Sequence, residues 1–483
     1  MTTSIHALLI DRDTIVTFGG AIDVPGHYGV QISKYDTLGN LLGFKTYFHS
    51  DGKPYVLSNS AGFIKTSDGG YLGVGDVNLG DNVVVFKFSH SGDLEWLSDI
   101  AYSNLRVIYA FDPIECNGGY MLAGLLQYLD YDVNGFICKI DFEGNLLWRK
   151  DYGVPGLMDV APFIRKKDEN SFLVSGGQNN GAGLGFPGFW MRSWVFEIDS
   201  TGTVLSDWKS EIAENVGNCK AELSGDHELV LITSRLYANY PNAAKLELTA
   251  RKLDTDDWHT VWQTSQTPPT MAYLVGWYDI KQSPADGGWD LVGTFLYEPN
   301  GAVLGGLTAH LNPDGERAWI RQDTVYLSPL LNANENYLVS MGHLSSGSIV
   351  AGGYVLSTEG GDLHQEAWLL KLSPDGCIEP GDCATVPSHE PNTASGPSFL
   401  NWEVFPNPAT SYTLLVPDRD LQGKQGKVAL YNVQGKLLRE FAFTVPAREA
   451  IRVDLSGLAP GMYTYQVQVE GQGLGGGKIM VMW

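Results

Sequence analysis

Short apolar runs separated by glycine-containing turns recur along most of this chain. In the clearest copy, Lys139–Trp148, a strand ends in Lys-Ile-Asp, a turn reads Phe-Glu-Gly-Asn, and a second strand carries Leu-Leu-Trp. Six further copies start at Lys34, Lys87, Glu197, Lys252, His310 and Lys371. Successive copies start 52 to 61 residues apart. A regular period in this range predicts a repeat architecture.

Each repeat unit also contains an earlier hairpin, so that four strands, a to d, follow one another. Strand a precedes a turn such as Ser67-Asp-Gly-Gly70, and strand b resembles Tyr71-Leu-Gly-Val-Gly75. Such turns supply the backbone conformations that hairpins need. Four short antiparallel strands per unit, in seven units, predict an all-β chain with a seven-bladed β-propeller. We expect four tryptophans of strand d to pack between neighbouring blades: Trp96, Trp148, Trp262 and Trp319.

The connections between strands divide into two faces. The a–b and c–d turns are short and uniform and share one face, whereas the b–c and d–a loops on the other face vary in length. Variable loops on a rigid scaffold often carry binding residues, and aromatic side chains suit sugars or apolar groups. The ligand-binding residues predicted on this face are Phe189, Trp190, Tyr237, Tyr240 and Tyr297. The alternative for each is that it covers a blade edge.

The two ends of the repeat region predict how the ring closes. Ile5–Ile10 already serves as strand a of the first unit, and after Gly376 the seventh unit lacks an apolar outer strand. We therefore predict a last blade of three strands, or with a rudimentary fourth, packed directly against the first. Met1–Ile10 has no basic region of the kind that opens a signal peptide. We expect the N-terminus to be incomplete or mis-started.

The residues that bear chemistry form few recognisable sets. Asp130, Asp132 and Asn134, followed by Gly135 and Asp141, have the spacing of a calcium loop. The register places the first three on a b–c hairpin, so a plain turn is the favoured interpretation over a calcium site. No nucleophile elbow, phosphate loop or paired-histidine motif is present. The sequence therefore predicts no cofactor apart from this calcium alternative.

The chain contains five cysteines. Cys377 and Cys383 flank a short turn at the end of the repeats, and a disulfide between them would fit an exported protein. Cys138 and Cys219 read as small core residues within strands, and Cys116 lies by a turn. An odd count leaves at least one free thiol.

Charge is distributed unevenly over a chain of 483 residues whose net charge is −23. From residue 401 onward, 8 basic residues oppose 7 acidic ones, so the preceding region carries −24. A field of that sign repels phosphate backbones and argues against nucleic acid as a partner. No apolar run approaches the length of a membrane span.

The composition changes sharply after the repeats. Residues 384–400 are rich in Pro, Ser and Thr and predict a flexible linker between residues 1–383, the propeller, and residues 401–483. The last region has about seven short alternating segments, which predicts a small Ig-like β-sandwich.

Four ordered motifs in the last region resemble the type A C-terminal sorting domain of the type IX secretion system. They are Trp402–Ala409, Val428–Lys436, Leu455–Tyr463 and Lys478–Val481. The resemblance implies that residues 401–483 engage the type IX secretion machinery of a Gram-negative bacterium. It further implies that the protein is secreted or anchored at the outer surface. The repeats are similar to those of large secreted propeller proteins of such bacteria.

Three classes of function remain open for the propeller. It is expected to be a binding or adhesion module, with glycans as the candidate ligand class, because no catalytic set is evident. A second class is a hydrolase or a quinone-type oxidoreductase. The repeats resemble the tryptophan-docking motif of quinone-dependent alcohol dehydrogenases, but Gly144 comes one residue too early and the adjacent cysteine pair is absent. A purely structural surface protein is the third class.

Overall fold

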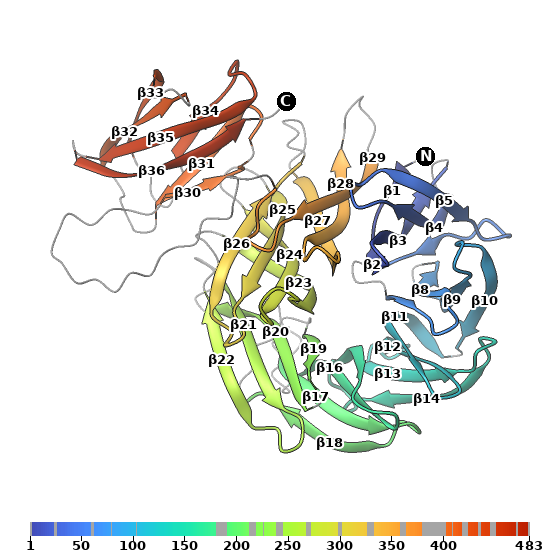
Figure 1. Ribbon diagram of the computed structural model, residues 1–483. Coiled ribbons are helices and arrows are strands. Elements are labelled where there is room, and N and C mark those ends of the chain that lie inside the picture. Colours follow the sequence, from blue (N-terminus) through green and yellow to red (C-terminus); the bar gives the residue numbers. More distant parts are fainter. Residues whose placement is uncertain are drawn as a thin grey trace.

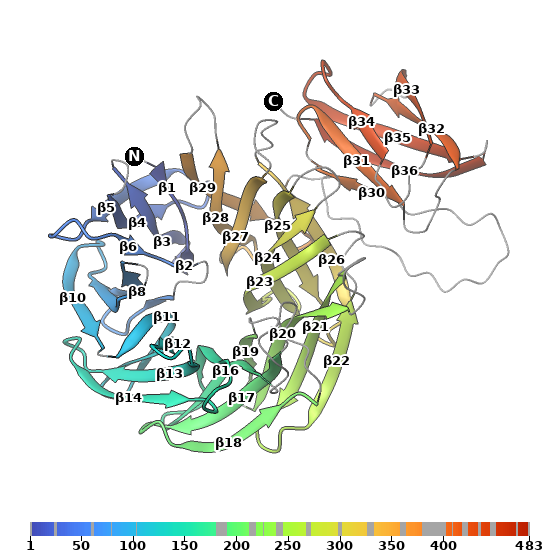
Figure 2. The ribbon, with the colours of Figure 1, turned by 180° about the vertical axis from the view of Figure 1, so that it is seen from behind.

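The computed structural model contains only β-strands, turns and irregular segments among the residues that it describes. These are 2–23, 27–58, 62–78, 80–102, 104–179, 191–211, 219–225, 227–237, 245–266, 272–297, 302–325, 333–357, 364–378, 402–407, 409–417, 424–432, 436–444, 451–469 and 472–481. Sheets of the repeat region follow one another around a central axis (Figure 1), which is seen from behind in Figure 2. The predicted seven-bladed propeller and the β-sandwich after it are confirmed.

Blades 1 to 4 are antiparallel sheets built from consecutive strands. Blade 1 contains β1 (Thr2–Thr3), β2 (Ala7–Asp11), β3 (Thr14–Ile22), β4 (Tyr28–Tyr35) and β5 (Leu41–Tyr47). Blade 2 contains β6 (Tyr55–Val56), β7 (Phe63–Lys65), β8 (Tyr71–Val77), β9 (Asn82–Phe88) and β10 (Leu94–Ala101). Blade 3 contains β11 (Leu105–Cys116), β12 (Gly119–Tyr128), β13 (Val133–Ile140) and β14 (Leu146–Tyr152). Blade 4 contains β15 (Asp159–Lys166), β16 (Ser171–Asn179), β17 (Met191–Asp199) and β18 (Val204–Lys209).

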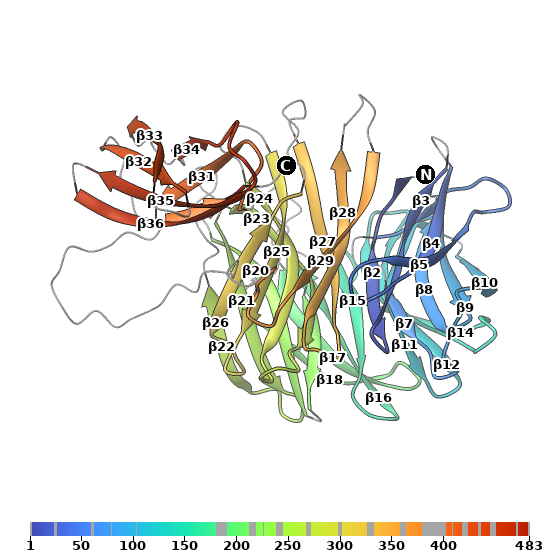
Figure 3. The same cartoon turned by 45° about the horizontal axis from the view of Figure 1, so that its top comes forward.

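Blades 5 to 7 continue the ring. Blade 5 contains β19 (Lys220–Ser224), β20 (Glu228–Tyr237), β21 (Lys245–Asp254) and β22 (Thr260–Gln266). Blade 6 contains β23 (Ala272–Gln282), β24 (Trp289–Tyr297), β25 (Ala302–Leu311) and β26 (Arg317–Asp323). Blade 7 contains β27 (Ala333–His343), β28 (Ile349–Ser357) and β29 (His364–Leu372). Figure 3 shows these blades in a tilted view.

The ring closes as the sequence predicted. Blade 7 has three strands among the described residues, and β1 and β2 both pair with β3 in blade 1. Contacts between the last and first blades are direct: the backbone N–H of Leu8 donates to Ser340 Oγ at 3.0 Å, and the N–H of Ser345 donates to Asp13 Oδ1 at 2.7 Å. A backbone hydrogen bond from Ile5 N to Gly353 O at 3.3 Å adds to these side-chain contacts, and no described strand of one blade joins the sheet of the other.

The hydrophobic core lies between successive blades. Apolar side chains of adjacent sheets interdigitate, as in the cluster formed by Leu72 and Val85 of blade 2 with Ile108, Leu122 and Phe136 of blade 3. Each of these five side chains is fully buried. Because every blade packs on two neighbours, burial accumulates around the ring instead of in one central core.

A tryptophan of strand d packs on the c–d turn of the next blade. A Cβ placed at Gly144 would lie 2.8 Å from the Trp96 ring, and one placed at Gly202 would lie 2.9 Å from the Trp148 ring. The pattern repeats for Trp262 with Gly315 and for Trp319 with Gly376. The predicted position of these tryptophans between blades is thus confirmed.

The same turn glycines accept hydrogen bonds from the preceding blade. The donors are hydroxyl groups on strand d. Tyr47 donates to Gly92 O at 2.9 Å, Ser98 to Gly144 O at 2.6 Å, Tyr152 to Gly202 O at 2.7 Å and Thr264 to Gly315 O at 2.9 Å. The turn itself is held by the aspartate of the Lys-Ile-Asp sequence. Asp141 Oδ1, for example, accepts from the N–H groups of Glu143 and Asn145. The recurrent stretch is therefore an inter-blade contact motif.

The C-terminal region is a two-sheet sandwich with a core of its own. One sheet orders β30 (Trp402–Phe405), β31 (Tyr412–Pro417) and β34 (Ile451–Asp454), and the other orders β33 (Leu437–Thr444), β32 (Gln425–Tyr431), β35 (Gly461–Val469) and β36 (Gln472–Val481). Leu415 and Val453 of the first sheet pack against Val428 and Ile479 of the second. Asn407 of the Phe-Pro-Asn-Pro motif accepts from Met480 N at 2.7 Å and donates to Lys478 O at 3.1 Å.

Because of the contact between tryptophan and glycine, the same substitution at two turn glycines should lower the free energy of unfolding by different amounts. Gly144 and Gly39 occupy corresponding turns with φ of 86° and 83°, but a Cβ at Gly39 meets nothing within 4 Å. Gly39→Ala should cost about 1–2 kcal/mol through left-handed backbone strain alone. Gly144→Ala should cost a further ~1–3 kcal/mol because Trp96 must move. Urea unfolding midpoints of the two variants measure the difference, and equal midpoints would contradict the contact.

Candidate functional site

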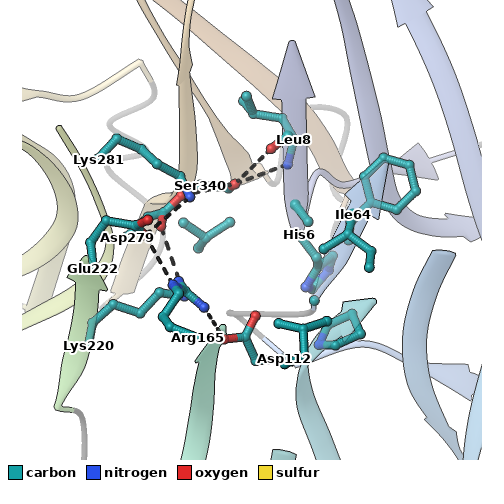
Figure 4. Close-up of a pocket in the computed structure, with 16 residues that line it drawn as sticks. His6, Leu8, Ile64, Asp112, Arg165, Lys220, Glu222, Asp279, Lys281 and Ser340 are labelled. Carbon is teal, nitrogen blue, oxygen red and sulfur yellow. Dashed lines mark hydrogen bonds and ion pairs between the residues drawn. The ribbon is translucent and has the colours of Figure 1, made fainter. Parts of the chain in front are cut away.

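A cavity of about 250 Å³ occupies the central channel of the propeller. Its lining comes from β2, β7, β11, β15, β19, β23 and β27, the innermost strands of the seven blades (Figure 4), together with His6 and Gly62 just before β2 and β7. The lining residues of β11, β15, β23 and β27 lie in the second half of each strand, toward the short a–b turns. The cavity is thus the place where all seven repeats converge.

Three of the lining side chains hold the inner edges of the blades together. The strand pairing shifts register just before Asp112 in β11, Asp279 in β23 and Ser340 in β27. Each side chain accepts a hydrogen bond from the next blade: Asp112 from Ile164 N at 3.1 Å, Asp279 from Met341 N at 3.1 Å and Ser340 from Leu8 N at 3.0 Å. These acceptors satisfy N–H groups that an edge strand otherwise leaves unpaired.

Three cations complete a ring of charge with Asp112, Asp279 and Glu222. Arg165 bonds Asp112, and its Nε lies 3.1 Å from Glu222 Oε2. Lys281 Nζ lies 3.6 Å from Glu222 Oε2, and Lys220 Nζ lies 3.9 Å from Asp279 Oδ1. The ring therefore contains three acidic and three basic side chains and is neutral in sum.

Lys220 differs from the other two cations in the contacts that its charged group makes. The residue is only 7% exposed, and its ammonium group makes no hydrogen bond with the described residues. That ammonium group lies 4.3 Å from the ring centroid of Phe163. Burial lowers the pKa of Lys220, although Asp279 opposes the shift. Asp279 and then Glu222 raise the pKa of Lys281. Lys220 is thus a buried ammonium with unfilled donors that faces a cavity.

Arg165 and Glu222 stabilise each other's charged forms. Burial lowers the pKa of Arg165, but Asp112 and Glu222 outweigh it and leave that pKa raised. Burial raises the pKa of Glu222, yet Lys281 and Arg165 bring it below its ordinary value. The carboxylates are committed to backbone N–H groups or to cations. The ring therefore holds the inner strands of successive blades together.

The cavity has a polar wall and an apolar wall. The charged side chains come from β11, β15, β19 and β23, in blades 3 to 6. Leu8 and Ile64 come from blades 1 and 2 on the other side (Figure 4), and Val339 of blade 7 also lines the cavity. Burial lowers the pKa of His6 in this lining to about 4, against a hydrogen bond from its imidazole to Ser58 O. A neutral His6 therefore adds no charge to the apolar side near neutral pH.

A second cluster of titratable groups joins blades 6 and 7 at the a–b turns. Asp290 contacts His310 Nδ1 and His343 Nε2, both at 2.7 Å, and Asp286 contacts His310 Nε2 at 2.9 Å. Asp290 and His310 are buried. Burial lowers the pKa of His310, but Asp290 and Asp286 outweigh it, so this pKa is raised. The cluster joins two blades and faces no cavity that the structure describes.

The predicted loop aromatics lie largely outside the described residues. This holds for Phe189, Trp190 and Tyr240, whereas Tyr237 and Tyr297 end β20 and β24 and their side chains are not described. Linker residues 384–400 also lie outside the described ranges. The loop-face binding site stays a prediction.

The calcium-loop spacing does not correspond to one loop in space. Asp132 ends the turn between β12 and β13, where its Oδ1 accepts from Gly156 N at 2.9 Å and its Oδ2 accepts from Asn134 Nδ2 at 3.4 Å. Asp130 Oδ1 accepts from Asp132 N at 3.3 Å. Asp141 caps the c–d turn at the far end of β13, whose eight residues span roughly 26 Å. Asp141 therefore cannot complete a calcium loop with Asp130, Asp132 and Asn134.

The cysteines agree with part of the sequence analysis. Cys377 is disulfide-bonded, and Cys116, Cys138 and Cys219 are buried free thiols. Cys383 lies outside the described residues, so its pairing with Cys377 stays a prediction.

Sequence reasoning missed the channel residues. Lys220 and Glu222, like Asp279 and Lys281, are two positions apart, which places both members of each pair on one face of a strand. Charged residues at that spacing in an innermost strand are a signal that could have been read. The register shifts before Asp112 and Asp279 were not readable, because one extra residue redirects all later side chains.

The architecture defines the chain as a β-propeller followed by a β-sandwich, and comparison with known families identifies the second unit. Residues 403–481 match the secretion system C-terminal sorting domain. The protein is therefore a type IX secretion cargo, secreted or anchored at the outer surface of a Gram-negative bacterium. Among the described residues, no helix has the length and apolarity needed to cross a membrane.

Other comparisons add no functional information. No curated protein matches the chain. The Pan2 WD40 domain of Neurospora crassa is 11% identical over 76% of this chain and 88% of that one, with a TM-score of 0.42. A Synechocystis apocarotenoid oxygenase variant is 11% identical over 64% and 68%, with a TM-score of 0.39. A subtype N10 neuraminidase-like protein of A/little yellow-shouldered bat/Guatemala is 9% identical over 63% and 94%, with a TM-score of 0.37. Scores this low support no argument about this chain.

The histidine cluster predicts a pH-dependent contribution to stability. Because the pKa of His310 is raised in the folded protein, protonated His310 stabilises the fold fully below pH 6.5, the ordinary histidine pKa. This stabilisation is lost as the pH rises through the folded-state pKa. Asp290, whose pKa is lowered, contributes above its ordinary value and loses that contribution as the pH falls through the folded value. His310→Gln should therefore lower Tm most between about pH 4 and 6.5, and less once the pH has risen through the raised pKa of His310. His227→Gln, at an exposed pair with Asp256, serves as the control; a pH-independent loss at His310 would refute the linkage.

The sorting domain predicts a clean separation of export from folding. Because the sandwich has its own core, deletion of residues 401–483 should leave the propeller folded but retained in the periplasm. Cell fractionation and surface proteolysis of the truncated and full chains measure this. Surface display of the truncated form would overturn the export assignment.

Proposed function

We propose that the protein is an exported binding module that holds a small polar ligand in the central channel of its propeller. The observation that carries the proposal is Lys220, which is buried, unpaired in hydrogen bonding within the described residues and directed at a cavity. A buried ammonium with unfilled donors costs free energy. A bound ligand that accepts those hydrogen bonds would offset the cost.

A binding role accounts for the channel better than the other two classes. Asp112 and Asp279 accept backbone N–H bonds, so hydrolysis would require groups already used to join blades. No described feature favours a quinone-type oxidoreductase. A purely structural protein would have no use for the unfilled donors of Lys220, since an apolar side chain of similar volume would stabilise the channel more.

Adhesion through the variable-loop face is kept as a second candidate. The sequence offers Phe189, Trp190, Tyr237, Tyr240 and Tyr297 for it. Variants of Lys220 and of the loop aromatics distinguish a site in the channel from a site on the loop face.

Substitution of Lys220 tests the channel site. Lys220→Met keeps the apolar stem and removes the ammonium, so ligand binding should weaken roughly tenfold to a hundredfold, the range of one or two charge-assisted hydrogen bonds. Full-length wild-type and variant chains are compared on a glycan array and on intact cells. The control is Lys53→Met, because Lys53 is exposed on a loop.

The loop variant decides between the two candidates. Trp190→Ala combined with Tyr237→Ala and Tyr240→Ala should leave binding within about threefold if the channel is the main site. Loss of binding in this variant, together with normal binding by Lys220→Met, would move the site to the loop face. A Tm within about 2 °C of wild type is required of each variant.

A further inference from the structure

We propose that the channel cavity accepts a neutral, hydroxyl-rich ligand the size of one sugar ring, with hydroxyl groups bridging Lys220 to Asp279 and Lys281 to Glu222. The inference rests on the proposed binding function and names its ligand class. It follows from the lengths of two ion pairs, the charge balance of the ring and the two unlike walls of the cavity.

The two ion pairs are too long for direct hydrogen bonds. Lys220 to Asp279 is 3.9 Å and Lys281 to Glu222 is 3.6 Å, whereas charge-assisted bonds are about 2.7–2.9 Å. A hydroxyl both accepts and donates. An oxygen about 2.8 Å from each partner can therefore accept from the ammonium and donate to the carboxylate. Two such gaps on β19 and β23 provide for two hydroxyls.

The charge balance argues against an ionic ligand. The three acids and three cations cancel within the ring, and burial lowers the pKa of His6 far enough to keep it neutral near pH 7. An added carboxylate, phosphate or amine would leave an uncompensated charge in a confined site. The region before residue 401 also carries a net charge of −24, which opposes anions in particular.

The walls of the cavity match the two sides of a sugar ring. Hydroxyl groups project around the rim of such a ring, and its faces present C–H groups. The charged side chains of blades 3 to 6 suit the rim, and Leu8, Ile64 and Val339 suit a C–H face. The volume of about 250 Å³ equals about eight waters at ~30 Å³ each. It lies below the ~300–1,000 Å³ of drug-sized pockets, so one ring fits.

Calorimetric titration of the full chain tests the ligand class. The probes are D-glucose, D-galactose and D-mannose as neutral rings, with D-glucuronate and D-glucosamine as charged rings of the same shape, and inorganic phosphate. At least one neutral sugar should bind at least tenfold more tightly than either charged ring. Its Kd should change by less than twofold between 50 and 500 mM NaCl, because no net charge is paired.

Two variants and one control locate the binding. Lys220→Met and Lys281→Met should each weaken the neutral sugar at least tenfold, and Lys53→Met should not. Tighter, salt-sensitive binding of glucuronate or phosphate would overturn the proposal in favour of an anion site. If one variant fails to fold, the other still decides the outcome.

Failure of the ligand class is distinguishable from failure of the binding function. If no neutral sugar binds at 50 mM while Lys220→Met still abolishes binding on the array, the channel is a binding site for another chemistry. If neither the array nor the sugars bind the full chain, both proposals fail. Binding of neutral sugars that is unaffected by both lysine variants would place the site elsewhere and reject this one.

Discussion

The contact of a strand-d tryptophan with the next blade's turn glycine is the interaction on which the ring depends. It requires three features at once: a glycine with positive φ, a flat ring above it, and a strand-d donor to its carbonyl. In blades 2 and 3 these are Gly144, Trp96 and Ser98. Since the contact always joins one blade to the next, it fixes both the spacing of the sheets and the direction of the ring. Among the described residues the contact joins four pairs of successive blades, through Trp96, Trp148, Trp262 and Trp319.

At the inner edges of the blades, side-chain hydrogen-bond acceptors join one blade to the next in place of the tryptophan contact. Inner strands have one open edge, and Asp112, Asp279 and Ser340 satisfy N–H groups of the following blade. Acidic side chains are good acceptors, but they bring charge into the channel. The cations Arg165, Lys220 and Lys281 balance that charge. The polar wall of the cavity is thus a consequence of how the ring is joined.

The parts of the fold that sequence could predict are those with a local cause. Asp141 and Gly144 specify their turn within five residues, and Trp148 follows at a fixed distance, so the repeat, the blade number and the inter-blade tryptophans were all predictable. The sandwich was predictable because its motifs occur in a fixed order. The calcium-loop spacing at Asp130 was the less favoured interpretation from the start, because the sequence already places a strand between Asn134 and Asp141.

The channel was not predictable because its geometry depends on contacts between distant blades. Lys220 and Asp279 are 59 positions apart and belong to different repeat units. Nothing in the sequence of either unit indicates that the two side chains meet. Pairing-register shifts then turn Asp279 toward the axis, and a pattern of period two cannot anticipate them. The loop aromatics posed the reverse difficulty: their residue types were suggestive, but nothing in the sequence fixes where long loops go.

The side chains of the channel depend on one another in a definite order. The fold fixes Asp112 and Asp279 through backbone hydrogen bonds, and the acids orient the cations through ion pairs. Of the cations, Arg165 is fully engaged by Asp112 and Glu222, while Lys220 retains unfilled donors. Substituting an acid therefore disturbs the ring, whereas substituting Lys220 removes a group that no backbone bond requires. Under the proposed binding function, the group that would contact the ligand is therefore separate from the groups that hold the blades together.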